Sequence, residues 1–598
     1  MATDNSTNAG SVRDTAPGLD IFKTPENSTF YSSNLYRNLD KRKQEIRLIE
    51  LSTQTGGDGI LECKLLPATL LTDIRKQYLA LSYCAGDPTN TKEIMVSGVK
   101  CNVFANLHHA LVLARHYWIQ SSEEGPLRLW IDQLCINQHD LSERSHQVGF
   151  MRDIYQSAER TLACLSTSTT SGEGLKWFND LCNAVPFQAD DESLKYDAEE
   201  KLGTEGGTEL QDLTRESAAL RHISKSCDFG QLWFRIGVYL CDNMYTGQFV
   251  DGWIAFYDVL TSPWWNRVWI CQEFLVSSQV TFMFGNHFIS WEKCWRNLES
   301  FCSTYEFVLR HRNNFQKLQE RKGLSLDSTD DGQVCRLLKV VRDSDNYRQA
   351  AHVKRAVKMK IHWNGSMHIR ALLSHSRSCK SSDDRDRVYA ILGLASPGYQ
   401  IFPEYSYHMT AAQVMITTTK AIIDKEDSLC ILVKATTLVR SRNLEVPSWV
   451  VDWTITKESQ IPGDHFGNML LFIMHGFTQE SPEHIYETII DAFRQTEAHI
   501  IRVYGRFITN ILVETREWPF VEFYSVRGWK YKALASIADE DELWMLQGLR
   551  VPIVLRPYRD GYQAISCAFT IEPGGNGLNE WLMSAGEGRA KRSRIVLY

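Results

Sequence analysis

The stretch "RLWIDQLCINQHDLSERSHQV" occupies residues 128–148 and decides how the fold is interpreted. It begins as a short apolar run, which is typical of a buried strand, and it turns polar at Asp132. Amide and charged side chains then crowd residues 132–144. A strand that ends abruptly in such a polar cluster indicates either a tightly capped turn or a functional site.

The sequence on both sides predicts a parallel sheet. Short apolar runs at residues 77–87, 127–131 and 161–166 are typical of buried strands, and residues 93–98 form another short run. Apolar residues recur at helical spacing over 106–118, where Asn106 is a candidate cap, and over 140–158. Alternating strands and helices with short links predict parallel strands with right-handed crossovers. Asp132 would then lie at a strand's carboxyl end, where open α/β sheets bind ligands.

Composition narrows the class of protein. The 598 residues allow about two to four domains. The net charge is 65 − 72 = −7, which argues against a protein built to coat nucleic acid. The 15 cysteines include no CxxC pair, so we expect reduced thiols in the cytoplasm and no zinc or other metal site. We find no secretory signal and no apolar run long enough to span a bilayer.

Three blocks of the sequence resemble the fungal heterokaryon incompatibility (HET) domain family. The blocks are "ALSYCAGD" at 80–87, the long segment at 129–165 and "RVWICQEF" at 267–274. Pieces at 386–394, 446–453 and 543–558 are also similar to the extended family. The first block departs from the family pattern, because Ala85 stands where the family usually has Trp.

This resemblance implies a domain order. We expect an α/β HET domain with a TIR/flavodoxin-like parallel sheet and helices on both faces, followed by a mixed α+β C-terminal region. The expected parts are a disordered segment at 1–28, the HET domain at 45–285, a mainly helical region at 286–440 and a β-rich region at 441–598. Within the HET domain, core blocks at 78–166 and 262–285 flank a helical insertion at 167–261. We interpret residues 262–277 as a helix with Ser262 as N-cap, followed by a hairpin that turns at Gly285.

HET domains are in turn similar to Toll/interleukin-1-receptor (TIR) domains, some of which cleave NAD. The TIR pattern has Ser-Tyr, Asp and Ser at strand ends and then Trp-x-x-x-Glu, matched here by Ser82-Tyr83, Asp132, Ser166 and Trp269–Glu273. The resemblance implies that Glu273 is the catalytic carboxylate and that NAD is a substrate rather than a bound cofactor. It implies the following ligand-binding residues: Ser82, Tyr83, Asp132, Asn137, Gln138 and Trp269.

Structural interpretations stand beside these roles. Asp140 and Glu143 have the spacing of a capping box, and Arg144 and Gln147 belong to the same structural motif. The alternative interpretation of Glu273 is a solvated residue on the edge of an amphipathic helix. Cys135 follows a strand and is a candidate nucleophile, but a buried cysteine explains it better.

Three functions remain open from the sequence. The first is fungal non-self recognition and programmed cell death through NAD cleavage. The second is a non-catalytic adaptor that signals by self-association of HET domains, triggered by an unknown protein. The third is nucleic-acid binding through the basic residues of 306–362, which a solvated helix face explains better. We expect no membrane partner, and short basic runs at 41–43 and 591–594 keep a nuclear location open as the alternative to the cytoplasm.

Overall fold

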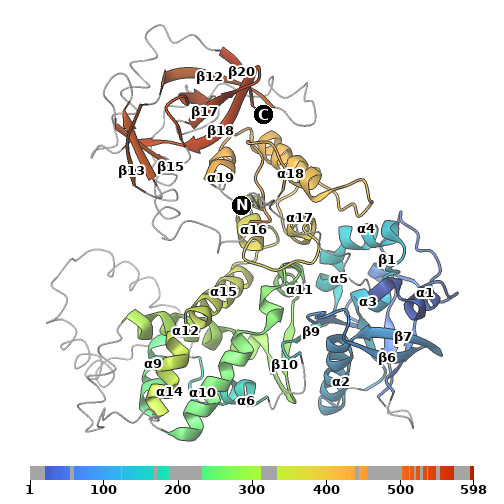
Figure 1. Cartoon of the computed structure of the whole chain (residues 1–598). Coiled ribbons are helices and arrows are strands. Elements are labelled where there is room, and N and C mark those ends of the chain that lie inside the picture. Colours follow the sequence, from blue (N-terminus) through green and yellow to red (C-terminus); the bar gives the residue numbers. More distant parts are fainter. Residues whose placement is uncertain are drawn as a thin grey trace, which may run out of the picture. The chain divides into compact units, whose positions relative to one another are not determined.

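The structure of the chain is a computed structural model (Figure 1). It describes residues 21–53, 60–122, 124–167, 172–187, 232–244, 246–310, 333–437, 444–455, 501–510, 512–517, 520–524, 530–534, 537–546, 553–570 and 593–597. The chain divides into two compact units. The first comprises Met1–Trp265 and Glu273–His362, and the second comprises Asn266–Gln272 and Trp363–Tyr598.

A nine-stranded sheet forms the centre of the first unit, in the order β11-β10-β9-β5-β8-β2-β3-β6-β7. The strands are β2 (Ile49–Leu51), β3 (Glu62–Leu65), β5 (Leu79–Ser82), β6 (Thr91–Val96), β7 (Val99–Phe104), β8 (Leu127–Trp130), β9 (Arg160–Cys164), β10 (Val280–Phe284) and β11 (His287–Ser290). A separate two-stranded sheet joins β1 (Glu45–Ile46) to β4 (Thr69–Leu70).

The predicted α/β class is confirmed, with one correction to the sheet. β8, β5, β9 and β10 are parallel to one another, and their chain order across the sheet is 2-1-3-4. This is the flavodoxin-like order, in which the connections reverse direction between the first and third strands. The sheet as a whole is mixed, because β2 is antiparallel to β8 and β3, and two hairpins add β7 and β11 at its edges.

The helices next to the sheet differ locally from the predictions. α2 (Ala105–Gln120) has Phe104 at its N-cap, and the Asn106 side chain donates instead to the carbonyl oxygen of Cys84 at 2.9 Å. The predicted helix at 140–158 is two helices, α4 (Leu141–Gly149) and α5 (Met151–Ser157). They are separated by Phe150, whose φ of −127° is not helical. α3 (Asp132–Cys135) is a single turn directly after β8.

The predicted disorder at 1–28 is wrong for residues 21–28, and the rest of that segment lies outside the described residues. Residues 21–31 form η1 (Ile21–Lys23) and α1 (Pro25–Tyr31). Buried Asn27 donates from its side-chain amide to the carbonyl of Asn102, and the Phe30 ring is fully buried. These contacts with β7 supply the stabilisation that the polar local sequence does not suggest.

Further helices complete the first unit. They are α6 (Glu173–Ala184), α9 (Leu232–Asn243), α10 (Gly247–Leu260), α12 (Trp291–Arg310), α14 (Gln333–Arg342) and α15 (Ser344–Ile361). The described part of the 167–261 insertion is thus helical. α6 packs closely on α10, because a Cβ added at Gly174 would lie 2.2 Å from the carbonyl oxygen of Ala255.

The segment at 262–277 is not one helix. A 3-10 turn, η4 (Pro263–Asn266), precedes α11 (Ile270–Leu275), so Trp269 lies before the helix that carries Glu273. Ser262 still accepts a hydrogen bond from the backbone N–H of Trp264 at 3.3 Å, as an N-cap does. The predicted hairpin is confirmed: β10 pairs with β11 across Gly285, whose φ is +56°.

The second unit combines helices with a β-rich end. Its helices are α16 (Ile369–Ser376), α17 (Asp386–Leu392), α18 (Ala411–Glu426) and α19 (Leu432–Thr437). A closed barrel joins β12 (Ile501–Asn510), β16 (Glu542–Leu546), β17 (Ile553–Tyr558), β18 (Gly561–Cys567) and β20 (Ser593–Leu597). A four-stranded sheet joins β13 (Leu512–Glu517), β14 (Phe520–Tyr524), β15 (Lys530–Leu534) and β19 (Phe569–Thr570).

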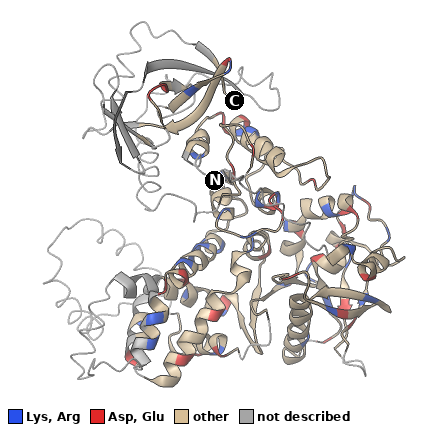
Figure 2. Cartoon of the chain, in the orientation of Figure 1, with Lys and Arg blue, Asp and Glu red and all other residues tan. Residues whose placement is uncertain are grey.

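The distribution of charge points to an ordinary polar surface. Lys and Arg are interspersed with Asp and Glu over the described helices of both units (Figure 2). Among the described helices, none is long and apolar enough to cross a membrane.

Candidate functional site

Ser82 and Glu273 lie together at the carboxyl end of the parallel strands. Ser82 is the last residue of β5, and its hydroxyl donates to the Glu273 carboxylate. The indole N–H of Trp264 donates to the Ser82 oxygen at 2.6 Å. All three side chains are buried, and Glu273 is only 1% exposed. The result is a buried chain of hydrogen bonds that runs from an indole through a hydroxyl to a carboxylate.

The position of Ser82 follows from the topology. β5 lies between β8 and β9, and Ser82 is opposite Ala163 on β9. After β5, the next parallel strand, β8, lies on one side of β5, and the following one, β9, lies on the other side. The connections therefore reverse direction between β5 and β9, and open α/β sheets bind ligands at such a point. Of the sequence-predicted residues, Ser82 and Glu273 are therefore brought together at this point. Trp264 was missed, because the predicted Trp-x-x-x-Glu spacing drew attention to Trp269.

A second group of predicted residues surrounds the end of β8. The Tyr83 hydroxyl donates to the Asp132 carboxylate at 3.2 Å, and the N–H of Gln133 donates to the same oxygen at 2.7 Å. The side-chain amide of Gln138 donates to the Asp132 carbonyl oxygen at 2.7 Å. Asn137 accepts from the N–H of His139 at 3.1 Å, which is a local turn contact. Asn137 and Gln138 thus shape the loop through backbone hydrogen bonds.

Two tyrosines of the N-terminal segment also hold this loop, and sequence reasoning missed both. The Tyr31 hydroxyl donates to the carbonyl of Gln133, and the Tyr36 hydroxyl donates to that of Leu134, each at 2.8 Å. Burial raises the pKa of both phenols, so they remain protonated donors. No local pattern marks them, because their partners lie about 100 residues away in the sequence.

The capping prediction at 140–143 is half correct. Asp140 caps α4 by accepting from the N–H groups of Ser142 and Glu143 at 2.9 and 3.1 Å. Glu143 instead forms a buried ion pair with Arg47, with an N–O distance of 2.6 Å. It also accepts from the N–H of Asn137 at 2.6 Å.

Arg47 is a further residue that the sequence did not single out. Besides Glu143, its guanidinium donates to the carbonyl oxygens of Cys135 and Arg37 at 3.2 and 2.6 Å. Arg47, which precedes β2, therefore contacts both ends of the polar loop at residues 132–144, through Cys135 and Glu143. Of the remaining motif residues, Gln147 is buried and donates to the carbonyl of Glu45 at 2.8 Å, whereas Arg144 is half-buried on α4.

A serine–histidine pair lies at the end of β9. Nε2 of His109, on α2, is 2.8 Å from the hydroxyl oxygen of Ser166. Desolvation lowers the pKa of His109, which favours the neutral imidazole. Ser166 was recognised only through the TIR resemblance, and His109 was missed because helical periodicity places it among apolar neighbours.

The thiols near the site are poor nucleophiles. Burial raises the pKa of Cys135 to about 12 and that of Cys164 to about 12. A thiol with such a pKa carries almost no thiolate at neutral pH. This supports the interpretation of Cys135 as a buried structural residue.

Trp269 belongs to the second unit, where its indole N–H donates to the Asp386 carboxylate at 3.1 Å. Its ring is half-buried and packs against Val268, Cys379 and Ala390. The structure therefore gives Trp269 and Glu273 different hydrogen-bond partners. The prediction that Trp269 binds a ligand stays a prediction.

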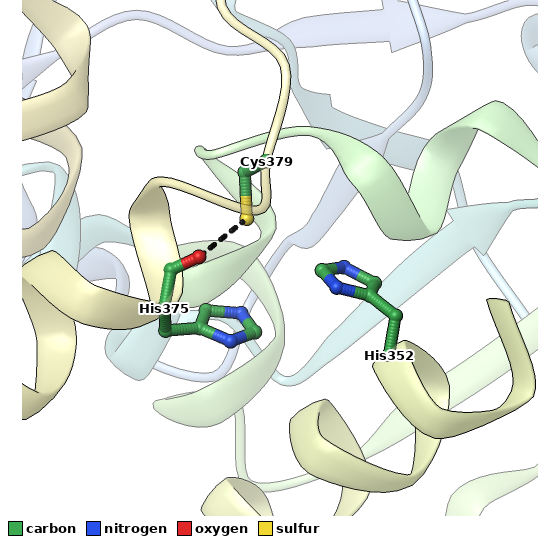
Figure 3. A group of neighbouring side chains, drawn as sticks. All are labelled: His352, His375 and Cys379. Carbon is green, nitrogen blue, oxygen red and sulfur yellow. Dashed lines mark hydrogen bonds between the residues drawn. The ribbon is translucent and has the colours of Figure 1, made fainter. Parts of the chain in front are cut away.

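Histidine and cysteine side chains are also held by backbone groups. In the second unit, the Cys379 thiol donates to the carbonyl oxygen of His375 at 3.5 Å, as the dashed line in Figure 3 shows. In the first unit, His352 Nε2 donates to the carbonyl oxygen of Trp265 at 2.9 Å. Each of these two hydrogen bonds joins groups of the same unit, and each one fixes the position of a buried side chain.

Comparison with known proteins finds one family match, and it covers about a third of the chain. Residues 78–273 match the family described as heterokaryon incompatibility protein (HET). Residues 78–273 are thus similar to a HET domain. The matched segment contains β5, β8 and β9, and it ends at Glu273, within α11.

A curated relative extends the similarity beyond the HET domain. The chain is 26% identical over 439 residues to heterokaryon incompatibility protein 6, OR allele, of Neurospora crassa. The match covers 68% of this chain and 57% of the relative, so the chain spans little more than half of that protein's length. No solved structure gives a significant match to the chain.

Proposed function

We propose that this HET-domain protein acts in fungal non-self recognition and the cell death that follows, by hydrolysing NAD at Glu273. The family of the HET domain and the name of the curated relative support the incompatibility role. The observation that carries the enzymatic part is the hydrogen bond between Ser82 and Glu273 at the carboxyl end of the parallel strands. That is where an open α/β sheet places a substrate.

The proposed reaction breaks the bond between nicotinamide and the ribose carbon. The electron pair of that bond leaves with nicotinamide, which departs as a neutral ring, and the ribose carbon develops oxocarbenium character. Glu273 stabilises the positive charge as a carboxylate, as the carboxylates of glycoside hydrolases do. Water then adds to the ribose carbon and releases a proton. The leaving group needs no strong general acid, so one carboxylate suffices.

Neighbouring residues fix the position of the carboxylate. The hydroxyl of Ser82 donates to Glu273, while Trp264 donates to Ser82 and fixes the direction of that hydroxyl. Asp132 and the loop that holds Asn137 and Gln138 follow the adjacent strand and are the proposed contacts for the rest of NAD. Opening of the site is required for catalysis, because Glu273 is 1% exposed.

The burial of Glu273 also favours a second function, a non-catalytic adaptor. In that case Glu273 and Ser82 hold the fold together, and the domain signals by self-association. The polar residues after β8 would then form the interface, with His139 at its exposed rim. A protein trigger is part of both proposals.

The test is nicotinamide release from NAD by the purified full chain, measured over a protein concentration series. Wild type is compared with Glu273→Gln and Ser82→Ala. Glu50→Gln is the matched control, because Glu50 lies on β2 and its contact with Arg128 is a solvent-exposed ion pair at 3.8 Å. We expect release by wild type and Glu50→Gln, and a loss of about a hundredfold or more in Glu273→Gln.

Two results would decide against the enzyme. Release that survives in a folded Glu273→Gln variant removes the catalytic role of this carboxylate. No release from a folded wild type at any concentration favours the adaptor. The substitutions His139→Glu and Arg144→Glu should then block self-association, measured by light scattering.

A further inference from the structure

The segment directly before Glu273 is built into the second unit, although it belongs to the HET family match. Asn266–Gln272 lies in the second unit, and the chain enters the first unit again at Glu273. The HET match ends at residue 273, so this segment is the last part of the domain by sequence. Its contacts with residues after 363 are therefore not those of a self-contained HET domain.

Backbone pairing fixes this segment. Arg267 and Lys380 form an isolated parallel β-bridge. The N–H of Val268 donates to the carbonyl of Lys380 at 3.1 Å, and the N–H of Lys380 donates to the carbonyl of Asn266. The segment thus behaves as a short strand paired with the turn after α16.

Side chains add a second anchor. Asp386, at the start of α17, is 4% exposed. It accepts from the indole N–H of Trp269 at 3.1 Å and from the hydroxyl of Tyr405 at 2.5 Å. Gln272 donates from its side-chain amide to the carbonyl of Tyr389 at 3.5 Å, one residue before Glu273. The contacts of this segment therefore reach Gln272, the residue before Glu273.

We propose that Asp386 is a positioning residue for Glu273, because it holds residues 267–272, which lead directly into that carboxylate along the chain. Trp269 is the link in this proposal rather than only a ligand contact. The inference deepens the proposed function, and its activity readout rests on that function. No sequence pattern showed it, because Trp269 and Asp386 are 117 residues apart.

Because α11 is short, its position depends on the contacts at its two ends. α11 has six residues, and a helix that short is not stable alone in water. Its placement therefore depends on what holds its two ends. Asp386 holds the segment before its first turn through Trp269. At the other end, Nζ of Lys360 donates to the carbonyls of Phe274 and Ser277 at 2.7 and 2.8 Å. Release of the first anchor leaves Glu273 with its Ser82 contact but without a fixed helix start.

The experiment uses the full chain with two variants, Asp386→Asn and Trp269→Phe. The first keeps the shape of the side chain and removes its charge, and the second keeps a ring and removes the indole N–H. Hydrogen–deuterium exchange is measured for peptides that cover residues 266–277, and nicotinamide release is measured beside it. Trp544→Phe is the matched control, because Trp544 also donates its indole N–H to a carboxylate of the second unit, that of Glu542, at 2.8 Å.

We expect exchange of the 266–277 amides to rise about tenfold in both variants, as the loss of a hydrogen bond to a charged group predicts. Peptides of the barrel and of β5 should keep the exchange of wild type. In the activity assay, kcat should fall at least tenfold while KM stays unchanged, because Glu273 is displaced but the NAD contacts after β8 remain. Trp544→Phe should change neither quantity.

Two outcomes would overturn the proposal. Unchanged exchange at 266–277 would show that Asp386 does not fix the segment. Increased exchange throughout the second unit would assign Asp386 to general stability instead. If wild type releases no nicotinamide, the NAD hypothesis fails, while the exchange measurement still decides whether Asp386 positions the segment before Glu273.

Discussion

The buried pair between Arg47 and Glu143 gives the sharpest test of how the polar loop is held. The perturbations are Arg47→Met, Glu143→Gln and the double variant. Arg47 and Glu143 are 2% and 5% exposed in their side chains, and their closest atoms are 2.6 Å apart. Each single change leaves one charge buried without its partner, which costs far more than the loss of an exposed ion pair.

The magnitude follows from burial and from the other bonds of the pair. Removal of one partner of a buried pair costs about 3–5 kcal/mol. Gln at position 143 keeps an acceptor for the N–H of Asn137, so the cost of Glu143→Gln comes mainly from the stranded guanidinium. The double variant removes both charges, and we expect it to cost less than either single change. A loss of about 3–5 kcal/mol is a large part of the stability of a typical domain.

The assay is unfolding in urea, monitored by hydrogen–deuterium exchange of peptides from residues 127–165. This readout isolates the first unit, because a chain with two units does not unfold in a single two-state step. The single variants should unfold at lower urea concentration, and amides of the 132–144 loop should exchange faster. A double variant whose loss equals the sum of the two single losses would refute the reasoning, because additivity means that the two side chains do not interact.

Three further predictions follow from burial and packing. Burial lowers the pKa of Lys360 to about 8 from its ordinary 10.5, so the folded state loses this proton at lower pH than the unfolded chain does. The free energy of unfolding should therefore rise as the pH increases from about 8 to 10.5. In thermal unfolding scans, Lys360→Met should remove this dependence on pH. Gly174→Ala places a Cβ 2.2 Å from the carbonyl oxygen of Ala255. It should destabilise the first unit by about 1–3 kcal/mol in the same urea assay. An unchanged stability would mean that α6 and α10 can move apart at no cost. Iodoacetamide at pH 8 should label half-exposed Cys84 well before Cys135, because burial raises the pKa of Cys135 to about 12. Mass spectrometry of the labelled peptides gives the order of labelling. The opposite order would contradict the burial of Cys135.

The sequence was sufficient for features that depend on local patterns. Apolar runs that end in polar residues located β5, β8 and β9, and short links between strands and helices predicted that these strands are parallel. Asp140 could be recognised as a helix cap because its partners, the N–H groups of Ser142 and Glu143, are two and three residues away. The carboxyl ends of parallel strands share one edge, so Asp132 was placed at the ligand-binding edge of the sheet without any knowledge of packing.

Local patterns were insufficient where a break or a long-range contact decides the structure. Residues 262–277 have the spacing of one helix, yet backbone pairing with Lys380 replaces helical hydrogen bonds just before α11. Glu143 has the spacing of a capping box, yet a distant arginine competes for its carboxylate. In both cases a tertiary contact was stronger than the local preference.

The sequence by itself therefore determined the strands, the α/β class, the cap at Asp140 and the family to which the HET blocks belong. Only the tertiary structure joined Ser82 to Glu273 across 191 residues, Arg47 to Glu143 across 96, and Trp269 to Asp386 across 117. The physical reason is that a capped turn is fixed by neighbours along the chain. A buried carboxylate, in contrast, must find its donor among all side chains that packing brings near, and no spacing in the sequence encodes that choice.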